Sequence, residues 1–154
     1  MHLRIDFLNF RFYIALTHSV LVDGVNSKVG EGNHFLMWDF DDKSEEEVKA
    51  ALVDVQKRYK LPRIFLINTG LPFYWHAYCF KGMSFADCVH ILASTKHIDK
   101  VFLKIGFLRE YYTLRFSPKK GRDFKEAIIL PSRYREDVNP YRIDNFLKYW
   151  TKRL

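Results

Sequence analysis

The sequence has few cysteines and no apolar run of membrane-spanning length. Cys79 and Cys88 are the only two among 154 residues, and neither belongs to a C-x-x-C pair or a His-Cys cluster, which excludes a cysteine zinc site. No hydrophobic stretch approaches the roughly 20 residues that cross a bilayer. The charges within the first six residues do not fit a signal peptide. We therefore expect a soluble, cytoplasmic protein with buried, reduced cysteines.

Acidic residues are also in the minority. The chain has 18 Asp and Glu against 25 Lys and Arg, a formal net charge of +7, and the basic residues crowd between Lys96 and Arg153. Such an imbalance favours polyanionic partners, first of all nucleic acid or nucleotide phosphates. A hydrophobic content of 48% with 17% aromatic residues argues against disorder, and the length fits one domain.

The apolar periodicity predicts an α+β fold. Two Ser-x-x-acid capping boxes, at Ser44 and Ser84, mark the starts of two helices. The stretch 97–109 is compatible with a further short helix. From residue 35 the expected order is strand, helix, strand, strand, helix, strand, over 35–41, 44–61, 63–69, 73–81, 84–92 and 111–117. This is the split β-α-β order of RRM-like and ferredoxin-like folds, an antiparallel sheet with helices on one face and the first strand between the third and the fourth.

We expect a single domain over residues 1–154. A β-rich N-terminal segment (1–33) precedes the RRM-like core (34–121), and a C-terminal extension (122–154) follows it. In this extension four apolar residues recur at helical spacing, which predicts a C-terminal helix packed on the core. They are Ile143, Phe146, Leu147 and Trp150.

Asp39 and Asp41 are the centre of the expected site. Because side chains alternate along a strand, both carboxylates point to one face. The same parity places His76 and Arg115 on that face. Adjacent carboxylates repel each other unless a cation lies between them, and their hard oxygens suit Mg²⁺ or Mn²⁺. The pattern predicts a metal and nucleoside triphosphate site in which Arg115 binds phosphate.

Further basic and aromatic residues extend this prediction. Lys119 would add to the grip on phosphate, Lys120 and Arg122 would touch the backbone of a nucleic acid, and Tyr74 would stack on a base. Each has a structural alternative. The lysines and the arginine also fit a solvated turn, and Tyr74 also fits a support for the N-terminal segment. His76 also fits a half-buried histidine whose hydrogen bonds are satisfied, and Arg115 also fits an ordinary surface charge.

The chain resembles the archaeo-eukaryotic primase superfamily. Its first motif, apolar residues before D-h-D, is matched by Phe35–Asp41. Its second, a histidine on a strand after a glycine turn, is matched by Thr69–Gly70 and Tyr74–His76, with bulky residues where the family has small ones. Its third, an apolar residue before an acid and then a basic stretch, is matched by Ile98–Asp99 and Tyr112–Gly121.

The resemblance implies a template-dependent nucleotidyltransferase, a DNA primase or primase-polymerase of a phage, plasmid or other mobile element. Such an enzyme uses two divalent metals, Mg²⁺ or Mn²⁺, with nucleoside triphosphates and a single-stranded DNA template. A separate helicase or accessory replication subunit is an expected partner, and a membrane is not. The implied metal ligands and catalytic residues are Asp39, Asp41 and Asp99, with Glu110 as a rival third acid, and the implied nucleotide ligands are His76, Arg115 and Lys119.

Two alternatives belong to other functional classes. The first is a catalytically inactive RRM-like module that binds nucleic acid. It lacks RNP-type aromatic motifs, and its central carboxylates would repel phosphates without a metal. The second is a replication-initiator or relaxase-type endonuclease. No His-hydrophobic-His pair occurs in the sequence, so it ranks last.

Overall fold

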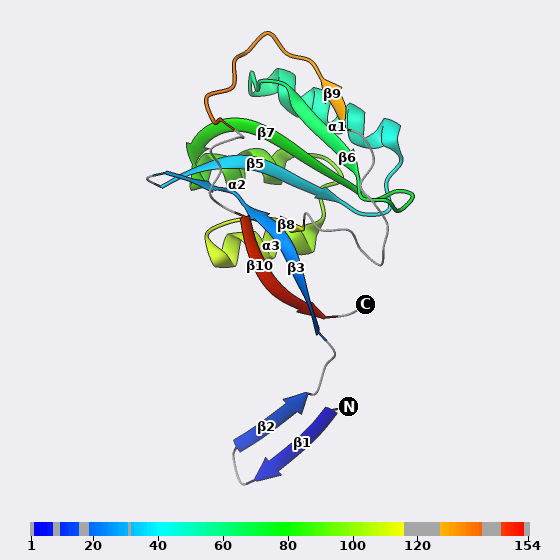
Figure 1. The fold of residues 1–154 in the computed structure, drawn as a ribbon, viewed down its shortest axis with the longest axis vertical. Helices are drawn as coiled ribbons and strands as arrows, with labels where there is room; N and C mark the ends of the chain where they lie inside the picture. Colours follow the sequence, from blue (N-terminus) through cyan, green and yellow to red (C-terminus); the bar gives the residue numbers. More distant parts are fainter. Residues whose placement is uncertain are drawn as a thin grey trace.

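The computed structural model describes residues 2–7, 10–15, 19–30, 32–115, 127–139 and 146–152, with side chains between residues 23 and 139. These residues form three antiparallel sheets and three helices. One sheet is the hairpin of β1 (His2–Phe7) and β2 (Phe10–Ala15), which lies apart from the other two sheets (Figure 1). The second has the order β10-β3-β8, with β3 (Ser19–Asn26), β8 (Thr113–Arg115) and β10 (Phe146–Lys152).

The third and largest sheet contains five strands in the order β4-β5-β7-β6-β9. They are β4 (Lys28–Val29), β5 (Asn33–Phe40), β6 (Ile64–Asn68), β7 (Trp75–Ser84) and β9 (Ile128–Leu130). The antiparallel pairing of β5 with β7 agrees with the predicted adjacency of the first and third strands of the core, and β6 pairs with β7 on its other side. The coarse prediction of an α+β fold with antiparallel sheets is confirmed too.

The predicted place of the fourth core strand is wrong. β8 pairs with β3, with Arg115 opposite Gly24, and β4 takes the position beside β5. Ser27 joins β3 to β4 and bridges β5 and the residue that precedes β8. Its N–H donates to the carbonyl of Tyr112 (2.9 Å), while its own carbonyl accepts from the N–H of Phe35 (2.9 Å). The N-terminal segment thus takes hydrogen bonds that an RRM-like order would form directly between the two strands.

The predicted C-terminal helix is also wrong where the structure describes it. Residues Phe146–Lys152 form β10, which pairs with β3 along its whole length, from Phe146 opposite Val25 to Lys152 opposite Ser19. Aromatic residues favour strands, and pairing with a neighbouring strand overrides a weak helical spacing. Residues 131–139 lie outside any helix or strand.

The helices α1 (Glu45–Arg58) and α2 (Phe85–Ser94) begin where the capping boxes at Ser44 and Ser84 predict, and α3 (Lys100–Arg109) lies in the stretch 97–109. The Ser44 hydroxyl accepts from the N–H of Glu47, and the Glu47 carboxylate accepts from the N–H of Ser44 (2.9 Å). Helices α1 and α2 lie on one side of the five-stranded sheet (Figure 1). None of the helices in the described ranges has the length and apolarity needed to cross a membrane.

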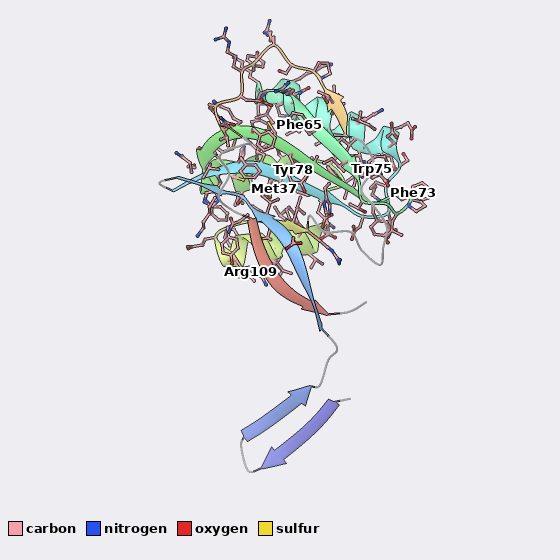
Figure 2. The ribbon with its side chains drawn as sticks, viewed as in Figure 1. Met37, Phe65, Phe73, Trp75, Tyr78 and Arg109 are labelled. Atoms are coloured by element: carbon pink, nitrogen blue, oxygen red, sulfur yellow. The ribbon has the colours of Figure 1, made fainter. Side chains whose placement is uncertain are left out.

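The core occupies both faces of the five-stranded sheet. On the helix side Trp38 is fully buried, and its indole N–H donates to the Thr95 hydroxyl at the end of α2 (3.0 Å). On the other side Met37 is fully buried beside Phe65 and Tyr78 (Figure 2). The expected open, helix-free face is therefore largely closed by apolar residues, and the carboxylates lie at its end and not at its middle.

Candidate active site

The site is built where β5 leaves the sheet. Asp39 is the penultimate residue of β5, and Asp41 follows the strand. The strand ends because Asp42 adopts a left-handed backbone (φ 56°), a conformation that aspartate tolerates better than most residues. The next N–H, of Lys43, donates to the carbonyl of Phe73 (3.0 Å). These contacts hold both carboxylates beside the loop that precedes β7.

Asp99 reaches the same place from α3. Its backbone N–H donates to the carbonyl of Asp39 (2.8 Å), and its side chain caps α3 by accepting from the N–H of Phe102. The rival acid, Glu110, is the C-cap at the opposite end of this 10-residue helix, about 15 Å away at 1.5 Å per residue. Of these two acids, only Asp99 lies near Asp39 and Asp41.

His76 lies directly opposite Asp39 in the pairing of β5 with β7, as the strand parity predicts. Its Nε2 is 3.6 Å from the nearer Asp39 oxygen, and its side chain is only 11% exposed. That distance is too long for a hydrogen bond. Burial lowers the pKa of His76 to about 4, so the imidazole is neutral at physiological pH. It is a neutral neighbour of the carboxylate and not a counter-charge.

Asp39 carries the signature of a crowded acidic site. The pKa of Asp39 is raised from 3.8 to about 7, first by burial and then by the nearby carboxylates of Asp41 and Asp99. A hydrogen bond from the Phe40 N–H acts in the opposite direction and lowers it. Both neighbours therefore act on Asp39 through their negative charge. A local surplus of negative charge of this kind attracts a cation.

The Asp39→Asn variant should be more stable than the parent at neutral pH. The folded protein holds the Asp39 proton more tightly than the unfolded chain, so ionisation costs stability progressively as the pH rises from 3.8 to about 7. An amide cannot ionise and avoids this cost. We expect a gain of about 2 kcal/mol at pH 7.5, allowing for screening at the partly exposed carboxylate, to be measured by urea unfolding.

The same variant should also reveal the acid sensitivity of His76. A buried imidazole with a folded pKa of about 4, below its ordinary 6.5, loses stability as the pH falls through that interval. In the parent, the stability lost at His76 as the pH falls is opposed by the stability gained as Asp39 becomes protonated. Exposed Glu46 on α1 supplies the matched control, because Glu46→Gln removes one charge without touching the site. Equal stability of Asp39→Asn and the parent at pH 7.5 would contradict the raised pKa.

A surface pocket of about 590 Å³ adjoins the acids. Its acidic wall contains Asp41 and Asp99, and its basic wall contains Lys43 and Lys100. Apolar side chains from the end of α2 and the start of α3 complete the lining. The remaining lining residues are Ala93, Thr95, His97, Ile98 and Leu103. Charges of both signs beside an apolar surface suit a ligand that has phosphates, a cation and a flat organic group.

The other predicted residues are placed less centrally. Tyr74 is half-buried, and a hydrogen bond to the Asp42 carboxylate raises its pKa, which puts Tyr74 beside the acidic end of β5. Arg115 ends β8 in the three-stranded sheet, although β8 also lies near β5. Its role at the phosphates stays a prediction. Lys119, Lys120 and Arg122 lie outside the described residues.

The donors fit a hard divalent cation in type and charge. Asp39, Asp41 and Asp99 offer carboxylate oxygens, the ligands that Mg²⁺ and Mn²⁺ prefer, and their mutual repulsion would be relieved by a cation. As the side chains stand, no group of three or more His, Cys, Asp or Glu within the described ranges is arranged to hold a metal ion. Binding would therefore require rotation of carboxylates that already lie near one another.

No protein-family model, curated protein or solved structure matches the chain. A function for this protein must therefore rest on the chemistry of the site.

Lys43 and Lys100 are the site residues that the sequence prediction missed. Lys100 directly follows Asp99, which is a predicted site residue. Lys43 directly follows Asp42, which is the neighbour of the predicted Asp41. A lysine beside an aspartate is common on protein surfaces, so the local sequence alone does not distinguish these two. Their convergence depends on the backbone contact between α3 and β5.

Proposed function

We propose that the protein is a template-dependent nucleotidyltransferase, a DNA primase or primase-polymerase that uses Mg²⁺ or Mn²⁺ and nucleoside triphosphates. One observation carries this proposal. Three carboxylates from two segments, Asp39 and Asp41 at the end of β5 and Asp99 at the start of α3, lie near one another beside a pocket with two lysines. The net charge of +7 supports a single-stranded DNA template as the partner.

Asp39, Asp41 and Asp99 are the residues that would hold the divalent metal. When bound, such a metal neutralises phosphate charge and activates a hydroxyl nucleophile. In the transfer itself the 3′ oxygen bonds to the α-phosphorus, the bond to the β-phosphate breaks, and pyrophosphate leaves in line.

Side chains that line the pocket, with Arg115 from outside its lining, would bind the nucleotide. Lys43 and Lys100 suit the phosphates as positive point charges, and Arg115 would add bidentate hydrogen bonds to phosphate oxygens. The apolar side of the pocket, Ile98 and Leu103 included, would exclude water from the base or sugar. Neutral His76 would support the position of Asp39 by packing beside its carboxylate.

A direct assay tests the proposal. Purified protein with Mn²⁺, a single-stranded DNA template and labelled nucleotides should form dinucleotides or extend a primer, and excess chelator should abolish the product. Template binding measured in parallel by fluorescence anisotropy distinguishes the main alternative. Binding of the template with no incorporation under any metal would contradict the enzyme and indicate an inactive RRM-like binding module.

The Asp99→Asn variant should lower incorporation at least about tenfold, the usual order for loss of one metal ligand or its support. Asparagine is as good an N-cap as aspartate, so this change removes the charge and keeps the start of α3. Glu110→Gln is the matched control, because it removes one charge at the far end of the same helix. Primer-extension rates measured side by side decide the matter, and an equal loss in both variants would exclude Asp99 from the site.

A further inference from the structure

Helix α3 exposes an apolar stripe on its outer face. Val101 is 63% exposed, Ile105 42% and Leu108 71%. These positions follow the i, i+4, i+7 spacing, so the three side chains form one row. The inner face is apolar as well, with Gly106 buried and Phe102 packed against the core. Single exposed apolar residues are ordinary, but a row of three on one helix marks an interaction surface.

Basic residues border this row, which we call the α3 stripe. At 100° per residue, Lys100 and Lys104 lie on one side of it and Arg109 lies on the other. All three are exposed, and Figure 2 shows Arg109 on α3 away from the five-stranded sheet. The ten residues of α3 contain no acid. The stripe is therefore an apolar strip with a positive rim.

The positive charges that border the α3 stripe determine which kind of partner fits it. A second copy of this chain would bring the same three cations against these, at a cost in repulsion. Nucleic acid would match the charge and leave the apolar row without a partner. An anionic bilayer would receive one face of a helix that is only 10 residues long and is packed on its other side. An acidic helix matches both features.

We propose that the outer face of α3 docks an acidic amphipathic helix of a partner protein. Apolar anchors at i, i+3, i+4 and i+7 of that helix would lie along Val101, Ile105 and Leu108, the usual mode of helix recognition. Glutamates or aspartates beside the anchors would face Lys100, Lys104 and Arg109. The apolar row lies outside the pocket lining and only Lys100 belongs to both surfaces, so the inference does not rest on the proposed catalytic function.

The first experiment uses a synthetic probe. A fluorescent 20-residue peptide carries leucines at i, i+3, i+4 and i+7 positions and glutamates at most others. We expect binding to the full protein with a Kd of about 10 μM at low salt, weakening as salt is raised. Two control peptides, one with the same composition in scrambled order and one with lysine in place of glutamate, should bind at least about tenfold more weakly.

Variants of the protein locate the binding surface. The double change Val101→Ser and Leu108→Ser should weaken peptide binding at least about tenfold, while thermal unfolding stays near that of the parent because both side chains are exposed. Ile129→Ser is the matched control, because Ile129 is a 52% exposed apolar residue on β9. It should leave the affinity unchanged.

Four results would overturn the inference. They are equal binding of the ordered and scrambled peptides, binding that survives the double change, dimerisation of the parent that Leu108→Ser abolishes, and binding to phosphatidylserine vesicles in place of the peptide. The last two would assign the stripe to a second copy or to a membrane. None of these measurements uses nucleotide incorporation, so failure of the catalytic proposal would leave this one standing.

Discussion

Replacing Asp39 and Asp41 together with alanine should abolish nucleotide incorporation, a fall of at least about a thousandfold, or about 4 kcal/mol in the activation barrier. The two carboxylates supply most of the negative charge that would hold the cation, and Asp99 alone would bind it far more weakly because two charged oxygen ligands are lost. Single-nucleotide incorporation with saturating Mn²⁺ measures the effect.

The design of this experiment separates catalysis from folding. Removal of Asp39 should leave the protein at least as stable as before, because its carboxylate is crowded by Asp41 and Asp99. A matched double variant, Glu46→Ala with Asp54→Ala, removes the same charge from the exposed face of α1. It should incorporate nucleotides at the parental rate. A double Asp39/Asp41 variant as active as the parent would refute the proposed site.

Gly106→Ala should destabilise the protein by at least about 2 kcal/mol, net of the helix propensity that alanine gains. Gly106 lies on the buried side of α3, where an added Cβ would come within 2.1 Å of the Tyr112 ring. That ring is fully buried and stacks near Phe85 and Phe102, so it cannot move aside without disturbing its neighbours.

Chemical denaturation measures the effect of Gly106→Ala, with Gly82→Ala as the control. A Cβ at Gly82 would meet Val138 at an ordinary 3.4 Å, so this change should cost less than about 1 kcal/mol. Equal stability of the two variants would mean that α3 does not pack on Tyr112 as described. Because Asp99 begins α3, the destabilised variant should also lose nucleotide incorporation.

Local patterns in the sequence predicted most elements of the core and one pairing at the candidate site. Alternation along 35–41 and 73–81 places Asp39 opposite His76, as observed. Capping boxes located α1 and α2 because they depend on residues only three positions apart. What the patterns could not show was burial. The imidazole of His76 is closed off by packing that involves many segments, and it is neutral for that reason.

Local sequence patterns could not predict which strands pair when they lie far apart in the chain. Ser27 lies between β5 and β8 through hydrogen bonds to Tyr112 and Phe35, and nothing near Ser27 in the sequence indicates this. The spacing of apolar residues around Phe146 and Trp150 fits a helix, yet this segment forms a strand that pairs with β3. The sequence left Asp99 and Glu110 open as the third acid, and only the long-range contact of Asp99 with Asp39 distinguishes the two.

The pairing of β3 with both β8 and β10 bears on how the chain is made. Residues 19–26 are synthesised well over a hundred residues before their partner strand at 146–152. Until then one side of β3 has no β10 to pair with, and an exposed strand edge invites association with other chains. Closure over so long a sequence separation is also slow. Premature termination before residue 146 should therefore yield a nascent product that depends on chaperones or is degraded.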